Sequence, residues 1–377
     1  MLIGKRVIDM EKISNIQNIA KGILICSVIF FHSKIFIDYS IINNFNISFL
    51  IFPCLIGVFF FYSGYNYTPK KRTAKESIKR RTKQLLLPIP VIWGLSTILV
   101  VPMLLLTNSA TLYNIKQSFV YVTMSEPWAL MSGFDISTFN FDLAVCIGVY
   151  WFLYTLWIVS CIFYLIVDFV NEKLSRHIIT VALLLFISFL IGQLVGPYLP
   201  FTIQCYPVIL AIMLTAAYLK KSNFLDKKEN KAKMCTKVIA FELIIILIST
   251  ICYFAFGANL VGALMGGRFN SSINGLDAYV SYLFSILGTY IIHNISKLVN
   301  KIPVISSFFE KFGENSAFVY ITHGIIISYI DTLIFNRNHE LFSSTAQSII
   351  YLFIVLVIYV ILFKIFKRGK KKNEQRN

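Results

Sequence analysis

Charged side chains are scarce in this chain. Asp, Glu, Lys and Arg together make up 14% of its 377 residues, whereas hydrophobic residues make up 57%. This balance excludes an ordinary soluble globular protein, in which about a quarter of the residues are charged. The sequence also lacks G-x-S-x-G, a P-loop and H-E-x-x-H, the local signatures of a serine hydrolase, a nucleotide-binding loop and a zinc peptidase. No cleavable signal peptide is expected, because no short apolar region is followed by a small-residue cleavage site.

Cysteine pairs of the kind that bind metal or form redox centres are also missing. The chain has seven cysteines, an odd number, and no two of them form a C-x-x-C pair. Most lie in or beside apolar runs, where a cysteine behaves as a small buried hydrophobic residue. We therefore expect no disulfide framework and no bound metal.

What the sequence does contain is a series of long apolar runs. Ten of them approach the ~20 residues that a helix needs to cross a bilayer. We therefore predict an all-α, polytopic membrane bundle that forms one domain over residues 1–377, with no appended soluble domain. The predicted spans are 17–37, 47–66, 84–106, 143–168, 178–196, 202–219, 238–256, 277–296, 316–335 and 345–366.

The net charge of +17 is distributed unevenly between the two sides of these spans. Thirty of the 35 Lys and Arg residues lie on the side of the two termini and of four connections, and only four lie on the other side. The basic connections are 67–83, 169–177, 220–237 and 297–315. Because positive charge stays inside, we predict cytoplasmic termini, with 107–142 and 257–276 outside. The charge therefore reflects topology and attraction to anionic lipid, and it gives no reason to expect nucleic-acid binding.

Within the first predicted span, the apolar run Asn18–His32 carries a lysine and a histidine, Lys21 and His32. Eleven residues at about 100° each bring a helix back to nearly the same face, so both side chains lie on one stripe, about 16 Å apart. Ionisable groups within a membrane helix usually face the protein interior or a wet cavity. The alternative is that Lys21 snorkels to the inner interface and His32 lies near the outer one.

A second polar face occurs in the ninth predicted span, where Ser316, Tyr320 and His323 follow an i, i+4, i+7 spacing. Such a face either joins helices by hydrogen bonds or lines a proton-handling cavity with histidine as general base. Two other histidines fall in predicted loops without an evident partner, and a third ends the eighth span near its cytoplasmic side. They are His177, His339 and His293, respectively.

Two predicted outer connections are long enough to contribute to a site. The connection 107–142 is too long for a plain turn and would cover an outer cavity. The connection 257–276 is rich in Gly and Asn and contains Arg268. Such a stretch either approaches a ligand closely or is simply flexible.

Six short motifs follow one another along the chain. The first motif is a basic residue, Lys21, followed after ten intervening residues by a histidine, His32. The others are Phe59–Tyr65 (FFFYSGY), Lys79–Pro88 (KRRTKQLLLP), Tyr150–Leu156 (YWFLYTL), Leu287–Lys297 and Gly313–His323 (GENSAFVYITH). Together they resemble the motifs of the membrane-bound acyltransferase-3 family. The most similar branch includes fucose 4-O-acetylases and surface-polysaccharide O-acetyltransferases.

The resemblance implies transfer of an acyl group, most often acetyl, from a coenzyme A thioester to a hydroxyl of a cell-surface or exopolysaccharide sugar or its lipid-linked precursor. It implies that His32 is the catalytic base or a transient acyl carrier. Donor phosphates would meet the basic side chains of Lys21, Arg80 and Arg81. Residues implied at the acceptor or cavity are Tyr65, Trp151, Arg268, Asn315, Ser316, Tyr320 and His323. Packing is the alternative role for the aromatic side chains among them.

The resemblance further implies acyl-CoA as a co-substrate without a permanently bound cofactor. Its partners would be a carbohydrate acceptor, the lipid bilayer and other polysaccharide-synthesis membrane proteins, at the plasma membrane of a bacterium. The rival is a transporter or flippase for a polysaccharide intermediate, which would have similar spans. Inverted repeats with Gly/Pro-broken segments would favour it, and the sequence shows none. A scaffold for a glycan-export complex is a third hypothesis.

Overall fold

The computed structural model describes residues 15–30, 55–69, 72–88, 151–194, 205–227, 230–256, 276–330 and 349–364 apart from 351, together with positions 90, 94, 98 and 203. Within these ranges all regular secondary structure is helical, and none of the residues forms a strand. The described part of the chain is therefore all-α, as the apolar runs predict.

Apart from α4 and α14, the described helices overlap the predicted apolar runs. Their bounds are Asn15–Phe30 (the first helix), α3 (Leu55–Tyr65), α4 (Ala74–Leu85), α8 (Trp151–Val170), α9 (Leu174–Leu194), α10 (Tyr206–Lys220), α11 (Lys231–Phe256), α13 (Leu276–Val299), α14 (Pro303–Glu314), α15 (Ser316–Ile330) and Leu352–Lys364 (the last helix). Three of them, α8, α9 and α11, are long and apolar enough to cross a membrane. The predicted total of ten spans stays a prediction, because several spans lie partly outside the described residues.

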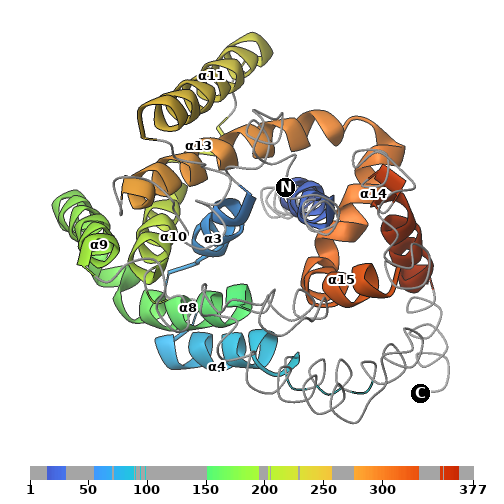
Figure 1. The fold of residues 1–377 in the computed structure, drawn as a ribbon. Coiled ribbons are helices and arrows are strands. Elements are labelled where there is room, and N and C mark those ends of the chain that lie inside the picture. The colour runs from blue at the N-terminus through green and yellow to red at the C-terminus, as the bar shows by residue number, and fades with distance from the viewer. Residues whose placement is uncertain are drawn as a thin grey trace, which may run out of the picture.

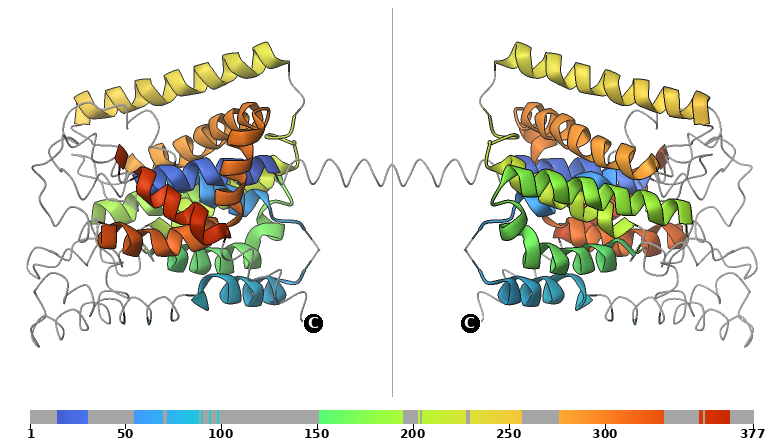
Figure 2. Two further views of the ribbon diagram at one scale, coloured as in Figure 1. Left: turned by 90° about the vertical axis from the view of Figure 1, so that its right-hand side faces the viewer. Right: turned by 90° about the vertical axis from the view of Figure 1, so that its left-hand side faces the viewer.

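Helix α3 lies in the middle of the bundle (Figure 1). Both α10 and α13 pack directly against it, while α8 and α9 pack against α10, and α11 packs on the outer side of α13. The first helix lies between α3 and the pair α14 and α15 (Figure 1). In the side views most helices run in a similar direction, whereas α14 crosses them at one end of the bundle (Figure 2).

One end of the bundle is rich in lysine and arginine, and we call it the basic end. It is the end at which the first helix begins and at which α3, α8, α10 and α13 finish. The connections between helices at this end are the four with most of the basic residues. The basic end also contains α4 and α14, so it is where the sequence places its cytoplasmic surface.

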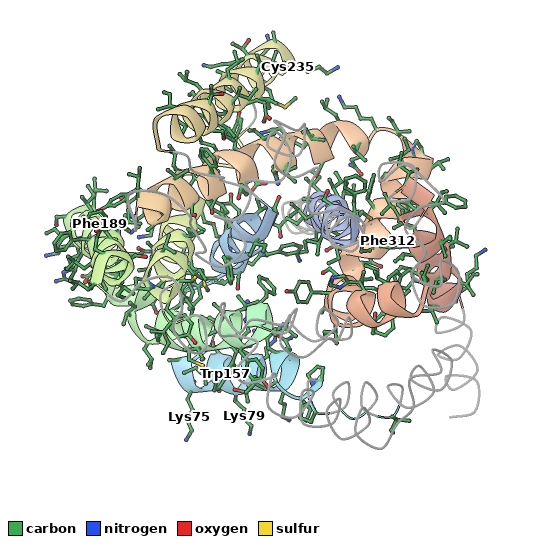
Figure 3. All side chains as sticks on the ribbon, in the orientation of Figure 1. Lys75, Lys79, Trp157, Phe189, Cys235 and Phe312 are labelled. Carbon is green, nitrogen blue, oxygen red and sulfur yellow. The ribbon has the colours of Figure 1, made fainter. Side chains whose placement is uncertain are left out.

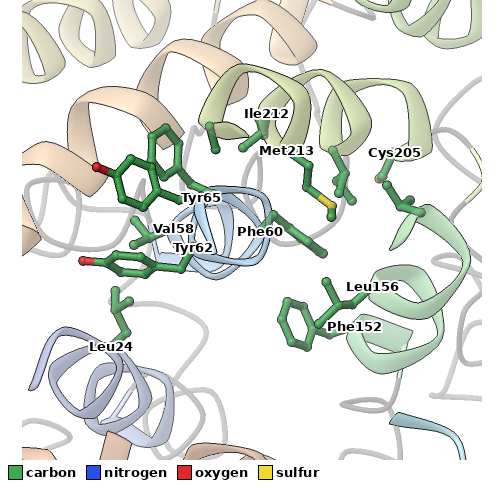
Figure 4. Close-up of a cluster of buried hydrophobic side chains, with 14 of the residues drawn as sticks. Leu24, Val58, Phe60, Tyr62, Tyr65, Phe152, Leu156, Cys205, Ile212 and Met213 are labelled. Carbon is green, nitrogen blue, oxygen red and sulfur yellow. The ribbon is translucent and has the colours of Figure 1, made fainter. Parts of the chain in front are cut away.

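Two glycines allow α3 to approach its neighbours at backbone distance. A Cβ atom added to Gly57 would overlap the side chain of Ser285 in α13. One added to Gly64 would overlap the backbone of Met213 in α10. Small residues at helix crossings are typical of membrane bundles, because close backbones gain dispersion contacts that lipid cannot replace. Figure 4 shows side chains of α8, α10 and the first helix around α3.

The first helix crosses α14 in the same way. A Cβ atom on Gly22 would overlap the backbone carbonyl of Phe309, and one on Gly313 would overlap the backbone carbonyl of Asn18. The two glycines come from different helices and contact sites one turn apart on the first helix. This double contact fixes where the first helix begins relative to α14.

Helices α4 and α14 lie within segments that the sequence predicts as plain connections, so that prediction was wrong for both. Both are amphipathic, and a search for long apolar runs overlooks such helices. The start of α4 has a capping box, in which Thr73 accepts from the Glu76 amide at 3.2 Å and Glu76 accepts from the Thr73 amide at 2.9 Å. Helix α14 begins with Pro303 at its first position, where no donor is needed.

Candidate functional site

Helix α4 carries Arg81 to the basic end of α3. The guanidinium donates from Nη2 to Ser63 Oγ at 2.5 Å and from Nε to Tyr164 Oη at 3.1 Å. Ser63 lies on α3 and Tyr164 on α8, so the arginine joins three helices. Its side chain is half-buried, whereas that of Arg80 is exposed.

The rotation of α4 explains why one arginine turns inward and its neighbour does not. The indole of Trp157 in α8 donates to Thr82 Oγ1 at 2.9 Å. This bond turns the Thr82 face of α4 toward α8. On the opposite face, Lys75 and Lys79 point away from the bundle (Figure 3). Thr82 and Arg81 therefore lie on the protein side of an otherwise solvated basic helix.

Lys21 of the first helix lies near Arg81, close enough for the two positive charges to repel each other. Its side chain is half-buried. Among the described residues, no carboxylate forms an ion pair with either cation. Two cations within electrostatic range of each other favour the binding of an anion, because an anion relieves their mutual repulsion.

A second polar cluster joins α3 to α13, and the sequence analysis does not predict it. Tyr65 donates to Asp226 Oδ2 at 3.0 Å, and Tyr62 Oη lies 3.2 Å from His293 Nδ1. The other ring nitrogen of His293 lies 3.8 Å from Asp226 Oδ1. The sequence suggested an interfacial position for His293, but its side chain is completely buried.

The polar face predicted for the ninth span turns inward in α15. Tyr320 and His323 are buried, and the Tyr320 ring packs on Phe152 of α8 with centroids 5.0 Å apart. His323 Nδ1 lies 2.6 Å from the Tyr320 carbonyl oxygen. A carbonyl oxygen only accepts, so Nδ1 carries the proton and Nε2 has the lone pair that a general base requires.

Comparison with known proteins gives a single clear match. A family model described as an acyltransferase domain matches residues 17–364, nearly the whole chain. The chain belongs to the acyltransferase-3 family. Searches of curated proteins and of solved structures found no match. Together with its apolar helices, the family match identifies the protein as a membrane acyltransferase.

In this acyltransferase the structure unites some of the predicted site residues and separates others. Lys21 and Arg81 come together, while Arg80 faces solvent. Ser316 is half-buried at the start of α15. Asn315 is exposed and donates to the Lys311 carbonyl at 2.8 Å, an interaction that ends α14. Its role at a cavity stays a prediction.

The side chains of several residues discussed in the sequence analysis are not described. His32 and Arg268 lie outside the described residues, as does His339. Trp151 begins α8, but the placement of its side chain is not described. The role of His32 as base therefore rests on the sequence motif and on its spacing from Lys21.

One histidine differs from its sequence interpretation. His177 does not lie in a loop without a partner, because it occupies the first turn of α9 and is buried. Its Nδ1 lies 2.9 Å from Asn171 Oδ1, and its ring stacks on Tyr218 with centroids 4.5 Å apart. These contacts join α9 to the ends of α8 and α10, which gives His177 a structural role.

The described residues of the acyltransferase contain no candidate metal site. Across the described ranges, no group of three or more His, Cys, Asp or Glu side chains could hold a metal ion. The cysteines described there are free, and they are Cys26, Cys161, Cys205 and Cys235.

Proposed function

We propose that this acyltransferase moves an acyl group, most often acetyl, from acyl-CoA to a hydroxyl of a cell-surface or exopolysaccharide sugar or its lipid-linked precursor. The observation that carries the proposal is the position of Arg81, which Ser63 and Tyr164 hold at the basic end within electrostatic range of Lys21. Coenzyme A carries several phosphate groups, and phosphate is the anion that arginine binds best. The resemblance to surface-polysaccharide O-acetyltransferases supports a carbohydrate acceptor.

Arg81 is oriented before any ligand arrives. Ser63 and Tyr164 accept two of its hydrogen bonds. A guanidinium has five N–H donors, so three remain for a phosphate. A side chain already held in place loses little entropy on binding, which strengthens each contact made with the ligand.

The proposed topology places this anion site where acyl-CoA is made. Both termini and the basic end are cytoplasmic in a ten-span protein of a bacterial plasma membrane. The phosphates rest at Lys21 and Arg81, and the pantetheine arm extends along the first helix toward His32. The helical rise sets a separation of about 16 Å along the axis between these two levels.

In the reaction that follows, His32 removes the proton from the acceptor hydroxyl. The hydroxyl oxygen attacks the thioester carbonyl, the carbon–sulfur bond breaks, and the leaving thiolate takes the proton from His32. The products are an acyl ester and free coenzyme A. General-base catalysis of this kind contributes about 10²–10⁴-fold.

The experiment that tests the proposal compares cell-surface polysaccharide from a wild-type strain and from a strain lacking this gene. We expect alkali-labile acyl groups, measured by NMR, to disappear on deletion and to return with the intact gene. A gene in which both Lys21 and Arg81 are alanine should not restore them. A transporter would give a different result, because unexported polysaccharide intermediates would accumulate while their acyl groups remained. That result would overturn the proposal.

A further inference from the structure

Two consecutive residues of α3 have different partners at the basic end. Ser63 accepts the hydrogen bond from Arg81, whereas Tyr62 lies against His293 of α13. Successive helical residues are about 100° apart around the axis, so the two side chains leave α3 in different directions. Any rotation of α3 that breaks the Tyr62 contact also moves Ser63.

Asp226 connects the tyrosines of α3 to α13. One carboxylate oxygen accepts from Tyr65 at 3.0 Å, and the other faces His293 Nε2 at 3.8 Å. Tyr62 and Tyr65 are three residues apart, and in Figure 4 their hydroxyl groups point to the same side of α3. His293 therefore lies between Tyr62 on one ring nitrogen and Asp226 on the other.

The segment that carries Asp226 is itself held firmly. Leu225 is buried, its carbonyl accepts from Lys297 of α13 at 2.6 Å, and its amide lies 3.4 Å from Tyr65 Oη. Phe224 packs on Tyr290 of α13 with centroids 5.5 Å apart. The connection after α10 is thus a fixed base for the carboxylate.

Apolar side chains of α3 such as Phe60 pack in the core, and polar contacts add direction to this packing. At its crossings with α13 and α10, α3 has Gly57 and Gly64, which have no side chain to interlock there. Directional polar contacts specify helix register where smooth surfaces cannot. His293 Nε2 is completely buried and has no hydrogen-bond partner in the described part of the chain, so Asp226 is its nearest described counter-group.

We propose that Asp226 and His293 are positioning residues for the donor site. They hold Tyr65 and Tyr62, thereby fix the rotation of α3, and so keep Ser63 where it directs Arg81 toward Lys21. The inference rests on the proposed function, because it assigns the ligand of that site to the phosphates of acyl-CoA.

The test measures equilibrium binding of labelled acetyl-CoA to the purified full-length protein in lipid nanodiscs. His293→Gln and Asp226→Asn each remove one side of the pair while keeping a similar volume. Each should weaken acetyl-CoA binding roughly three- to tenfold, the effect of losing about one hydrogen bond. The matched control is His177→Gln, which removes another buried histidine near the same end without a described contact to α3. Its acetyl-CoA affinity should equal that of the unsubstituted protein.

A thermodynamic cycle distinguishes positioning from a general loss of structure. If Asp226 acts through Arg81, the double variant Asp226→Asn/Arg81→Lys should bind acetyl-CoA no more weakly than Arg81→Lys alone. Multiplying effects in the double variant would overturn the inference. Asp226 is partly exposed, so its variant still decides the question if His293→Gln does not fold.

The remaining outcomes separate the two proposals. An unsubstituted protein that does not bind acetyl-CoA would contradict the proposed function itself. If the unsubstituted protein and both variants bind acetyl-CoA equally well, the positioning role is overturned and the proposed function stays intact. Weaker binding in His177→Gln as well would also count against a specific role for His293.

Discussion

The Nη2 atom of Arg81 lies 2.5 Å from the hydroxyl oxygen of Ser63, and this contact joins two motifs that are separate in the sequence. Ser63 belongs to the Phe59–Tyr65 motif and Arg81 to the Lys79–Pro88 motif. Lys21, from the first motif, lies close to the same guanidinium. Residues from three of the six motifs therefore contribute to one site.

The first prediction concerns donor affinity. Arg81→Lys keeps the positive charge but removes the planar fork, so the contacts with Ser63 and Tyr164 cannot both form. Hydrogen bonds to charged groups contribute ~1.5–3 kcal/mol, so we expect the KM for acetyl-CoA to rise roughly ten- to a hundredfold. The KM for the acceptor should hardly change. Initial rates in a reconstituted acyl-transfer assay measure both.

Arg80→Lys is the matched control for this prediction. The sequence assigns both arginines to the donor, but Arg80 is exposed and only Arg81 contacts α3 and α8. We therefore expect normal donor kinetics for Arg80→Lys. A raised donor KM in this variant, with none in Arg81→Lys, would place the phosphates elsewhere on α4.

The sequence predicts the apolar helices well and the amphipathic ones poorly. Helices α8, α9 and α11 fall on long apolar runs, which only a buried or membrane-facing helix explains. Helix α4 mixes lysines and glutamate with few apolar residues, so a hydropathy search takes it for a loop. Its capping box, Thr73 with Glu76, was nevertheless readable as the start of a helix.

The sequence predicts the charged residues of the site but not their partners. The spacing of basic residues and the motifs identify Lys21 and Arg81, because a charge in an apolar setting is conspicuous. The partners Ser63 and Tyr164 are not conspicuous, and only the packing of α3, α4 and α8 brings them to Arg81. The position of His293 in the sequence suggests an interfacial side chain, but Asp226 lies against it from a connection whose path the sequence does not reveal.

The second prediction tests the orientation in the membrane. Cys235 is free and exposed near the start of α11, at the edge of the bundle (Figure 3). If the basic end is cytoplasmic, a membrane-impermeant maleimide should label Cys235 in inside-out vesicles and not in intact cells. Labelling in vesicles should disappear in Cys235→Ser. In that background Lys116→Cys should be labelled in intact cells. The reverse pattern would show that the orientation is wrong.

The third prediction concerns His32. His32→Ala should abolish acyl transfer, because His32 is the motif histidine and the only histidine of the first predicted span, and so the only side chain there suited to act as a general base near neutral pH. Binding of acetyl-CoA and the amount of protein in the membrane should stay normal, since a helix that continued to His32 would place it about 16 Å beyond Lys21 along the axis. Equal acylation of polysaccharide by variant and parent would rule out His32 as base or acyl carrier. Loss of donor binding would instead assign it to the binding site.

The fourth prediction concerns the crossing of the first helix and α14. Gly313→Ala places a methyl group on the Asn18 carbonyl, so the first helix must move away, at a cost of about 1–3 kcal/mol in the free energy of unfolding. Gly94→Ala is the control, because a methyl group there meets nothing within 4 Å. The midpoint of thermal unfolding in nanodiscs should fall for Gly313→Ala and not for Gly94→Ala. Because the first helix also carries Lys21 to Arg81, acetyl-CoA binding should weaken together with stability. Normal stability of Gly313→Ala would mean that the helices do not touch here.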